Sequence, residues 1–252
     1  LNLTHLLYRS WCRHCVRGRG KSAAHYLQEA DQKHAIPHVS FDYVFLGQED
    51  EKTLPIVLIR DHALKVTYSH ALPCKGTAGS SYPARQVAYS IKQLGHSKLV
   101  FKSDNEPALL DVKTDVCKSL RMDHGITVTE EESPVEDHQA NGVVERANGE
   151  FGGMARTLND QLIHNYKWTP STTHPVYAWL VNYAGYLLTR FHVGVDGKTA
   201  YERWKGKKYK KPLLVFAEHV LYLPVRTANQ KKNKLAPKWE DGIFLGAQRL
   251  LR

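Results

Sequence analysis

Three carboxylates occupy positions at which a carboxylate is unusual. Asp42 lies in the middle of an alternating, strand-like run, where aspartate is normally depleted. Asp104 ends a short apolar run, and Glu145 follows two valines at the start of a long amphipathic segment. Each has an ordinary explanation: an exposed sheet face for Asp42, a turn cap for Asp104 and the positive end of a helix for Glu145. Taken singly, each position favours that ordinary explanation.

Together, the three carboxylates predict a metal site. If the strands that carry Asp42 and Asp104 lie side by side at the centre of a sheet, the later helix can bring Glu145 against them. Three converging carboxylates repel one another unless a cation supplies counter-charge. Mg²⁺ and Mn²⁺ prefer oxygen ligands, and a pair of such ions can support in-line phosphoryl transfer. The triad therefore indicates metal-dependent phosphoryl-transfer chemistry.

The four cysteines do not suggest a disulfide framework. Cys12 and Cys15 form a C-x-x-C pair, which is typical of half of a zinc site. His5, His14 and His25 lie near this pair, but their spacing matches no zinc pattern. A reduced pair of cysteines without an ion is the alternative, because a tetrahedral zinc site needs a full set of four ligands.

Alternating strands and helices must position the carboxylates. Three strand-like runs come first, at residues 38–46, 53–61 and 65–72. A helix, a strand, a helix and a strand follow at residues 82–95, 97–104, 108–121 and 125–131. In the first run, Val39, Phe41, Tyr43 and Phe45 share one face and Asp42 lies on the other. This order predicts an α/β fold with a mixed five-stranded sheet flanked by helices.

A long helix is expected after the polar loop that precedes Asn141. Apolar residues recur along it every three to four positions, namely Val144, Ala147, Phe151, Met154 or Ala155, Leu158 and Leu162. Glu145, Asn148, Gly152, Arg156 and Asn159 form a separate polar stripe. A second, more apolar helix is predicted from Pro175 to about His192. We expect it to lie in the core, with a subunit interface as the alternative.

The charge of the chain is segregated along the sequence. Residues 1–37 carry +4, residues 38–197 carry −4 and residues 198–252 carry +10, which sum to the net charge of +10. A slightly acidic middle with basic ends predicts a cation-binding core and appendages that bind a polyanion, with nucleic acid favoured over a merely solvated surface. No apolar run is long enough to span a membrane, so we expect no membrane partner.

Several stretches resemble one known family. Asp42 on its strand, "KSDNE" around Asp104 and "SPVEDHQANGVVERANGE" around Glu145 resemble the DDE catalytic core of retroviral and copia-type retrotransposon integrases. "WCRHCVRGRGK" is similar to the second half of the zinc-binding His-His-Cys-Cys module that precedes such cores, and "KTAYERWKGKKYKKPLLVFAEHVLYLPV" is similar to the region that follows copia-type cores. The resemblance implies a truncated zinc-binding-like segment at residues 1–34, a ribonuclease-H-like catalytic core at 35–197 and a basic, β-rich extension at 198–252.

The resemblance also implies an activity. Asp42, Asp104 and Glu145 would hold two Mg²⁺ or Mn²⁺ ions for 3′-end processing and strand transfer by a polynucleotidyl transferase. The partners would be element ends and target DNA, within a homo-oligomer that acts in the nucleus, with a cytoplasmic particle stage. The chain begins with Leu1 rather than Met, and we expect a piece of a longer polyprotein. The alternative is a catalytically silent DNA-binding relic or a domesticated fragment.

The sequence departs from the family pattern at several positions. Glu106 stands where the family usually has Gly, and Asp137 adds a carboxylate to the polar loop. Forty residues separate Asp104 from Glu145, which is more than is typical of the family. The family's histidine pair would lie upstream of Leu1, so we expect Zn²⁺ at Cys12 and Cys15 only if those missing ligands are supplied.

Residues predicted to contact nucleic acid lie in the polar loop, on the long helix and in a lysine run. They are Gln139, Asn141, Arg146, Asn148, Arg156, Lys205, Lys207, Lys208, Lys210 and Lys211. For the lysine run, a sequence-independent phosphate patch and a solvated linker are equally good interpretations.

Overall fold

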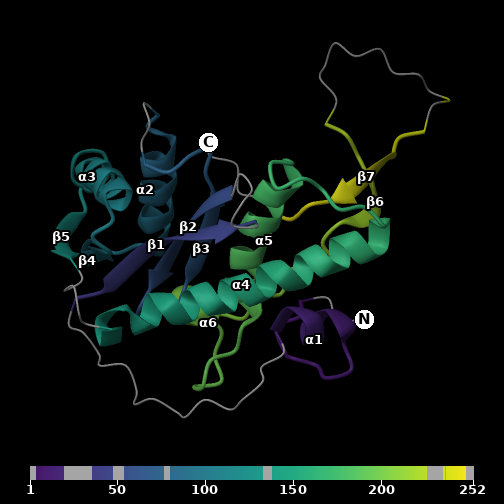
Figure 1. The fold of residues 1–252 in the computed structure, drawn as a ribbon, viewed down its shortest axis with the longest axis horizontal. Coiled ribbons are helices and arrows are strands. Elements are labelled where there is room, and N and C mark those ends of the chain that lie inside the picture. The colour runs from purple at the N-terminus through teal and green to yellow at the C-terminus, as the bar shows by residue number, and fades with distance from the viewer. Residues whose placement is uncertain are drawn as a thin grey trace.

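Five strands form the central sheet in the order β3-β2-β1-β4-β5 (Figure 1). The strands are β1 (His38–Leu46), β2 (Leu54–Asp61), β3 (Thr67–Ala71), β4 (Lys98–Ser103) and β5 (Thr127–Glu132). The first three form an antiparallel meander, while β4 runs parallel to both β1 and β5. The predicted mixed five-stranded sheet is therefore confirmed. This computed structural model describes residues 4–19, 36–47, 54–76, 80–132, 138–225, 235 and 237–247.

Two helices, α2 (Tyr82–Leu94) and α3 (Pro107–Met122), cover one face of the sheet. The predicted alternation of β1 explains the packing, because Val39, Phe41 and Tyr43 are all buried on this side. Phe45, the last residue of the predicted row, is exposed near the end of the strand. Helix α2 ends where the sequence predicted, at Gly95. This residue adopts a left-handed conformation with φ 87°, and its N–H donates to the carbonyl of Lys92.

The other face of the sheet is covered by α4 (His138–Tyr166) and α5 (Val176–Phe191), and α4 runs across the front of the molecule in Figure 1. Every residue of the predicted apolar stripe on α4 is buried, including both Met154 and Ala155. Helix α5 buries Leu180, Val181 and Leu187 in the same cluster. The expectation that this apolar helix lies in the core is confirmed.

A short helix that the sequence did not predict, α1 (Arg13–Arg19), lies against α4. The two helices approach closely because a side chain is missing at their contact. A Cβ atom at Gly18 would lie only 2.9 Å from the backbone nitrogen of Thr157. An ion pair between Arg17 and Asp160, with 2.9 Å between nitrogen and oxygen, adds a polar contact at the same crossing.

The basic C-terminal region contains a helix as well as strands. Helix α6 (Ala200–Lys205) begins at Thr199, which exchanges capping hydrogen bonds with Glu202. Ala200 and Trp204 of this helix pack on the cluster beneath α2 and α3. Strands β6 (Glu218–Tyr222) and β7 (Glu240–Phe244) form a separate antiparallel pair in the extension that was predicted to be β-rich. The partition into three segments at residues 34 and 197 stays a prediction.

None of the helices in the described part of the chain has the length and apolar character needed to cross a membrane.

Candidate metal-binding active site

Asp42 and Asp104 come from neighbouring strands at the middle of the sheet. Ser40 of β1 lies opposite Lys102 of β4 in a parallel register, and each strand reaches its aspartate two residues later. Asp42 pairs across β2 with Leu58, which is buried beneath α4 and α5. Asp42 therefore lies on the sheet face that α4 covers, opposite Phe41 and Tyr43, as the alternation predicted.

Helix α4 contacts Asp42 directly through Asn148. The Asn148 Nδ2 atom donates a hydrogen bond of 2.7 Å to Asp42 Oδ2, and the backbone N–H of Tyr43 donates one of 2.7 Å to Oδ1. Burial raises the pKa of the Asp42 carboxyl, the charges of Asp104 and Glu106 raise it further, and the two hydrogen bonds act in the opposite direction. The Asp42 carboxyl is thus a partly buried acid whose pKa lies above its usual value.

The third predicted carboxylate, Glu145, is exposed in the N-terminal part of α4. Only three residues in the described part of the chain form a group of His, Cys, Asp or Glu whose ligand atoms all lie within 4.8 Å of one another, and Glu145 is not among them. The structure therefore brings Asp42 and α4 together but does not place Asp42, Asp104 and Glu145 at ligand distance from one shared point. Their role as a metal triad stays a prediction.

Glu106, which departs from the family pattern, forms an ion pair at the edge of this site. Its Oε1 atom lies 2.7 Å from Lys75 Nζ, and the Lys75 ammonium also lies 4.5 Å from the centre of the Phe45 ring. The next residue, Gly76, donates its backbone N–H to the Tyr43 hydroxyl at 2.9 Å. These contacts hold the loop after β3 against β1 and the start of α3, and Lys75 partly offsets the extra carboxylate.

The residues predicted to contact nucleic acid have different environments. Asn148 is partly buried against Asp42 rather than exposed on the polar stripe. Arg156 is exposed, but its Nε atom donates to the carbonyl of Gly18 at 3.1 Å, so it also holds α1 on α4. Gln139 and Asn141 lie in the first turn of α4, and their side chains fall outside the described part of the structure.

The remaining predicted nucleic-acid contacts are exposed basic residues, namely Arg146, Lys205, Lys207, Lys208, Lys210 and Lys211. The ammonium of Lys205 lies 3.5 Å from the centre of the Trp204 ring. Their exposure is compatible with both interpretations of the lysine run, the phosphate patch and the solvated linker.

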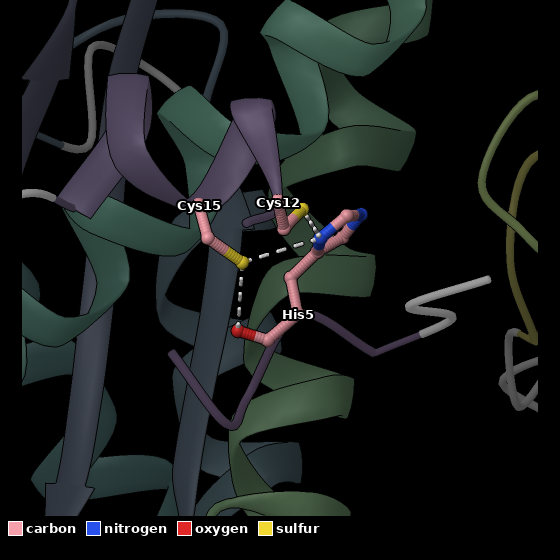
Figure 2. A group of neighbouring side chains, drawn as sticks. All are labelled: His5, Cys12 and Cys15. Atoms are coloured by element: carbon pink, nitrogen blue, oxygen red, sulfur yellow. Dashed lines mark hydrogen bonds between the residues drawn. The ribbon is translucent and has the colours of Figure 1, made fainter. Parts of the chain in front are cut away.

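The group of potential ligands that the structure does bring together is His5, Cys12 and Cys15, all buried. The Nδ1 atom of His5 lies 3.5 Å from each of the two sulfur atoms, and Figure 2 shows the three side chains pointing toward one another. Burial raises the pKa of Cys15. The cluster supplies three of the four ligands of a tetrahedral zinc site. The spacing of His5 gave no recognisable signal, because a loop and the start of α1 bring it to the cysteines.

Comparisons with known proteins support the fold at low sequence identity. No protein-family model matches the sequence, and no curated protein matches it. The trimeric form of the HTLV-2 integrase catalytic core domain in complex with magnesium matches over 68% of this chain and 99% of its own, with 15% identity and a TM-score of 0.48. Its dimeric form matches over 67% and 97%, with 16% identity and a TM-score of 0.46.

The simian T-cell lymphotropic virus intasome in complex with PP2A regulatory subunit B56 gamma matches over a larger part of the chain. The match covers 92% of this chain and 76% of the matched chain, with 14% identity and a TM-score of 0.51. The copia type stays a prediction from the sequence motifs. The order of the strands, the two layers of helices and this likeness agree, and the chain has the ribonuclease-H-like fold of a retroviral integrase core.

Proposed function

We propose that this chain is a copia-type retrotransposon integrase, which trims the 3′ ends of element DNA and joins them to target DNA in a metal-dependent reaction. The observation that carries the proposal is the contact between the active-site helix and the first strand. Asn148 of α4 bonds to Asp42, whose strand neighbours the strand that leads to Asp104. This geometry occurs in a chain that has the integrase fold.

The donor atoms at Asp42 and Asp104 fit a hard divalent cation. Both are carboxylates, and the negative charge of Asp104 raises the pKa of Asp42, so a cation bound between them would relieve their repulsion. The Oδ1 atom of Asn148 is buried beside them and has no hydrogen-bond partner in the described part of the chain. Such an acceptor suits a water molecule held near a cation. We assign Asp42, Asp104 and Glu145 as the ligands of Mg²⁺ or Mn²⁺.

Each residue has a distinct role in the proposed reaction. When bound, two divalent ions would lower the pKa of the attacking oxygen and stabilise the leaving one. Asp42, Asp104 and Glu145 would hold these ions through their carboxylate oxygens. Asn148 orients the Asp42 carboxylate and favours its ionised form, because its amide donates to the charged group.

DNA is the proposed partner, on grounds of charge. The exposed lysines beyond residue 204 lie in a region of net charge +10, and such residues bind phosphate without reading sequence. We further propose that the protein acts as a homo-oligomer in the nucleus and derives from a longer polyprotein, as the resemblance to copia-type elements implies.

A structural zinc ion is proposed at His5, Cys12 and Cys15 if a fourth ligand comes from outside the described residues. The ion would join the segment before α1 to α1 itself and so hold α1 against α4. Zinc content per chain, measured by atomic absorption in the wild type and in Cys15→Ser, tests this part. One equivalent in the wild type that is lost in the variant supports it, and no zinc in either protein contradicts it.

The second candidate is a catalytically silent DNA-binding protein with the same fold. The observation that favours it is the position of Glu145, whose carboxylate does not join a ligand group with the two aspartates. This candidate predicts DNA binding without metal-dependent chemistry.

A disintegration assay separates the two candidates. A branched DNA that mimics the joined product is incubated with Mn²⁺ or Mg²⁺ and either the wild type or Glu145→Gln, and DNA retention on filters is scored in the same tubes. The integrase predicts joined strands from the wild type and none from the variant, with equal retention. Retention by both proteins without joining by either would leave the silent DNA-binding protein. Cleavage without joining would indicate a ribonuclease-H-like nuclease.

A further inference from the structure

A second polar contact fastens α4 to the sheet, on the flank opposite Asn148. Glu150 of α4 lies 3.5 Å from Arg60 of β2, measured from Oε2 to Nη2. His192, which follows the last residue of α5, places its Nδ1 atom 3.6 Å from the same carboxylate oxygen. Arg60 is 8% exposed and also donates from Nη1 to the hydroxyl of Thr67 on β3. One acidic side chain thus connects α4 to β2, β3 and the end of α5.

The charge on Glu150 is retained in these surroundings. Burial alone would raise the pKa of its carboxyl, but the neighbouring His192 imidazole and the charges of Arg60 and Arg146 outweigh burial, and the pKa lies below its usual value. Arg60 is almost fully buried, so removing its carboxylate partner would leave an uncompensated charge under the helix. Removing either Glu150 or Arg60 alone is therefore expected to lower the stability of the protein, because the charge of the other residue would be left buried without its partner.

The two polar contacts lie on opposite sides of the buried stripe of α4. Ala147 and Phe151 form the centre of that stripe, with Asn148 on one flank and Glu150 on the other. Apolar packing alone fixes the distance of a helix from a sheet more tightly than its rotation about its own axis. A hydrogen bond on the Asn148 flank and ion pairs on the Glu150 flank fix that rotation, and with it the direction of Glu145 one turn before Asn148.

Helix α4 needs such contacts because its own helical propensity is low at this point. Gly149 lies between Asn148 and Glu150, and Gly152 and Gly153 follow shortly after. Each glycine costs a helix interior about 1 kcal/mol relative to alanine. A Cβ atom at Gly153 would lie 2.7 Å from the Arg19 side chain, so this glycine is needed for the approach of α1. The tertiary contacts of Glu150 offset the local weakness.

We propose that Glu150 is a positioning residue: its contacts with Arg60 and His192 fix the rotation of α4, and so set the direction from which Glu145 reaches the metal ligands Asp42 and Asp104. The metal part of this inference rests on the proposed function, whereas the ordering of α4 does not. No contact of Glu150 itself with metal or DNA is required.

The test compares Glu150→Gln with the matched variant Asp160→Asn, which removes an ion pair at the far end of the same helix. Amide hydrogen exchange is measured along α4 in both, without metal or DNA. Glu150→Gln is expected to speed exchange selectively at residues 143–150, by about tenfold, and Asp160→Asn to speed it only beyond residue 156. Exchange that is unchanged at 143–150, or faster uniformly along α4, would overturn the proposal.

The functional consequence is read in the Mn²⁺ concentration that half-saturates disintegration. Glu150→Gln should raise it by about tenfold, as loss of a group that orients metal ligands does, while Asp160→Asn leaves it unchanged. An active wild type with no shift in Glu150→Gln would overturn the inference and leave the proposed function intact. An inactive wild type with the predicted exchange pattern would refute the function and leave the positioning role of Glu150 standing.

If Glu150→Gln does not fold, His192→Gln decides the question. His192 is partly exposed and lies outside α4, so its replacement removes one partner of Glu150 without leaving Arg60 unpaired. It should give the same exchange pattern at 143–150 by about threefold. No change there would overturn the proposal.

Discussion

Mn²⁺ binding weakens as pH falls, and replacing Asn148 by leucine is expected to make this loss of affinity begin at a higher pH. Leucine has the same branching and number of heavy side-chain atoms as asparagine but cannot donate to the Asp42 carboxylate, which now accepts a 2.7 Å hydrogen bond from Asn148 Nδ2. The pKa of Asp42 is already raised by burial and by the charge of Asp104, and the hydrogen bond from Asn148 lowers it. Its loss therefore raises the pKa further.

The size of the shift follows from the strength of the contact. A hydrogen bond to a charged group contributes about 1.5–3 kcal/mol, and each pKa unit corresponds to about 1.36 kcal/mol. Loss of this contact should therefore raise the pKa of Asp42 and weaken Mn²⁺ binding on the acid side by about tenfold to a hundredfold. Since Mn²⁺ binds the ionised carboxylate, affinity is lost as pH falls through this pKa, and in Asn148→Leu that loss begins at higher pH.

Calorimetric titration with Mn²⁺ at a series of pH values measures the shift directly. Asn159→Leu is the matched control, because Asn159 lies on the same helix and bonds to the Tyr177 hydroxyl rather than to a carboxylate. Its loss of affinity with falling pH should coincide with that of the wild type. Coincidence of the Asn148→Leu curve with the wild-type curve would refute the reasoning that this contact keeps Asp42 ionised.

Three further perturbations test the fold and the DNA contacts. Burial lowers the pKa of His70 to about 4, so the unfolded chain takes up a proton at this residue before the folded chain does as pH falls below about 6.5. The folded protein therefore loses free energy of unfolding between pH 7 and pH 4. His70→Gln should reduce this loss by up to about 3 kcal/mol, measured by urea titration at the two pH values. An equal loss in both proteins would contradict this. Phe151→Ala, at a fully buried position, should cost about 3–5 kcal/mol in the same assay, whereas exposed Leu221→Ala should change stability by no more than about 0.5 kcal/mol. Equal effects would contradict the core assignment. The last change replaces five lysines with glutamine, namely Lys205, Lys207, Lys208, Lys210 and Lys211. The slope of the logarithm of the DNA-binding constant against the logarithm of the salt concentration should become less steep by about 4. An unchanged slope would identify a solvated linker.

Periodicity predicted the central layers of the fold well. The alternation of β1 and the three-to-four-residue repeat of α4 both predicted which face of the element is buried, and the structure buries the apolar residues on these faces. Helix α6 was missed because the lysine run that begins at its last residue suggested a linker, although the Thr199 and Glu202 capping box is a local signal that identifies it. Helix α1 had no such signal, since its stability depends on the close contact of Gly18 with α4.

The order of the strands and the alternation of side chains along them predicted only part of the site. Residue types placed Asp42 and Asp104 on adjoining strands, but no one-dimensional pattern indicates that Asn148 turns inward to Asp42. The same holds for His5, whose contact with the cysteines depends on the path of a loop. Arg60 gave one overlooked signal, because a charged residue inside a buried strand requires a partner from another element.

The most direct test of the metal triad is anomalous scattering from crystals of the chain grown with Mn²⁺ and branched DNA. The account predicts two manganese peaks at the active site, one shared by Asp42 and Asp104 and one shared by Asp42 and Glu145. Manganese bound elsewhere, with the three carboxylates free of metal in a DNA-bound crystal, would contradict the central claim that this fold carries a working integrase site.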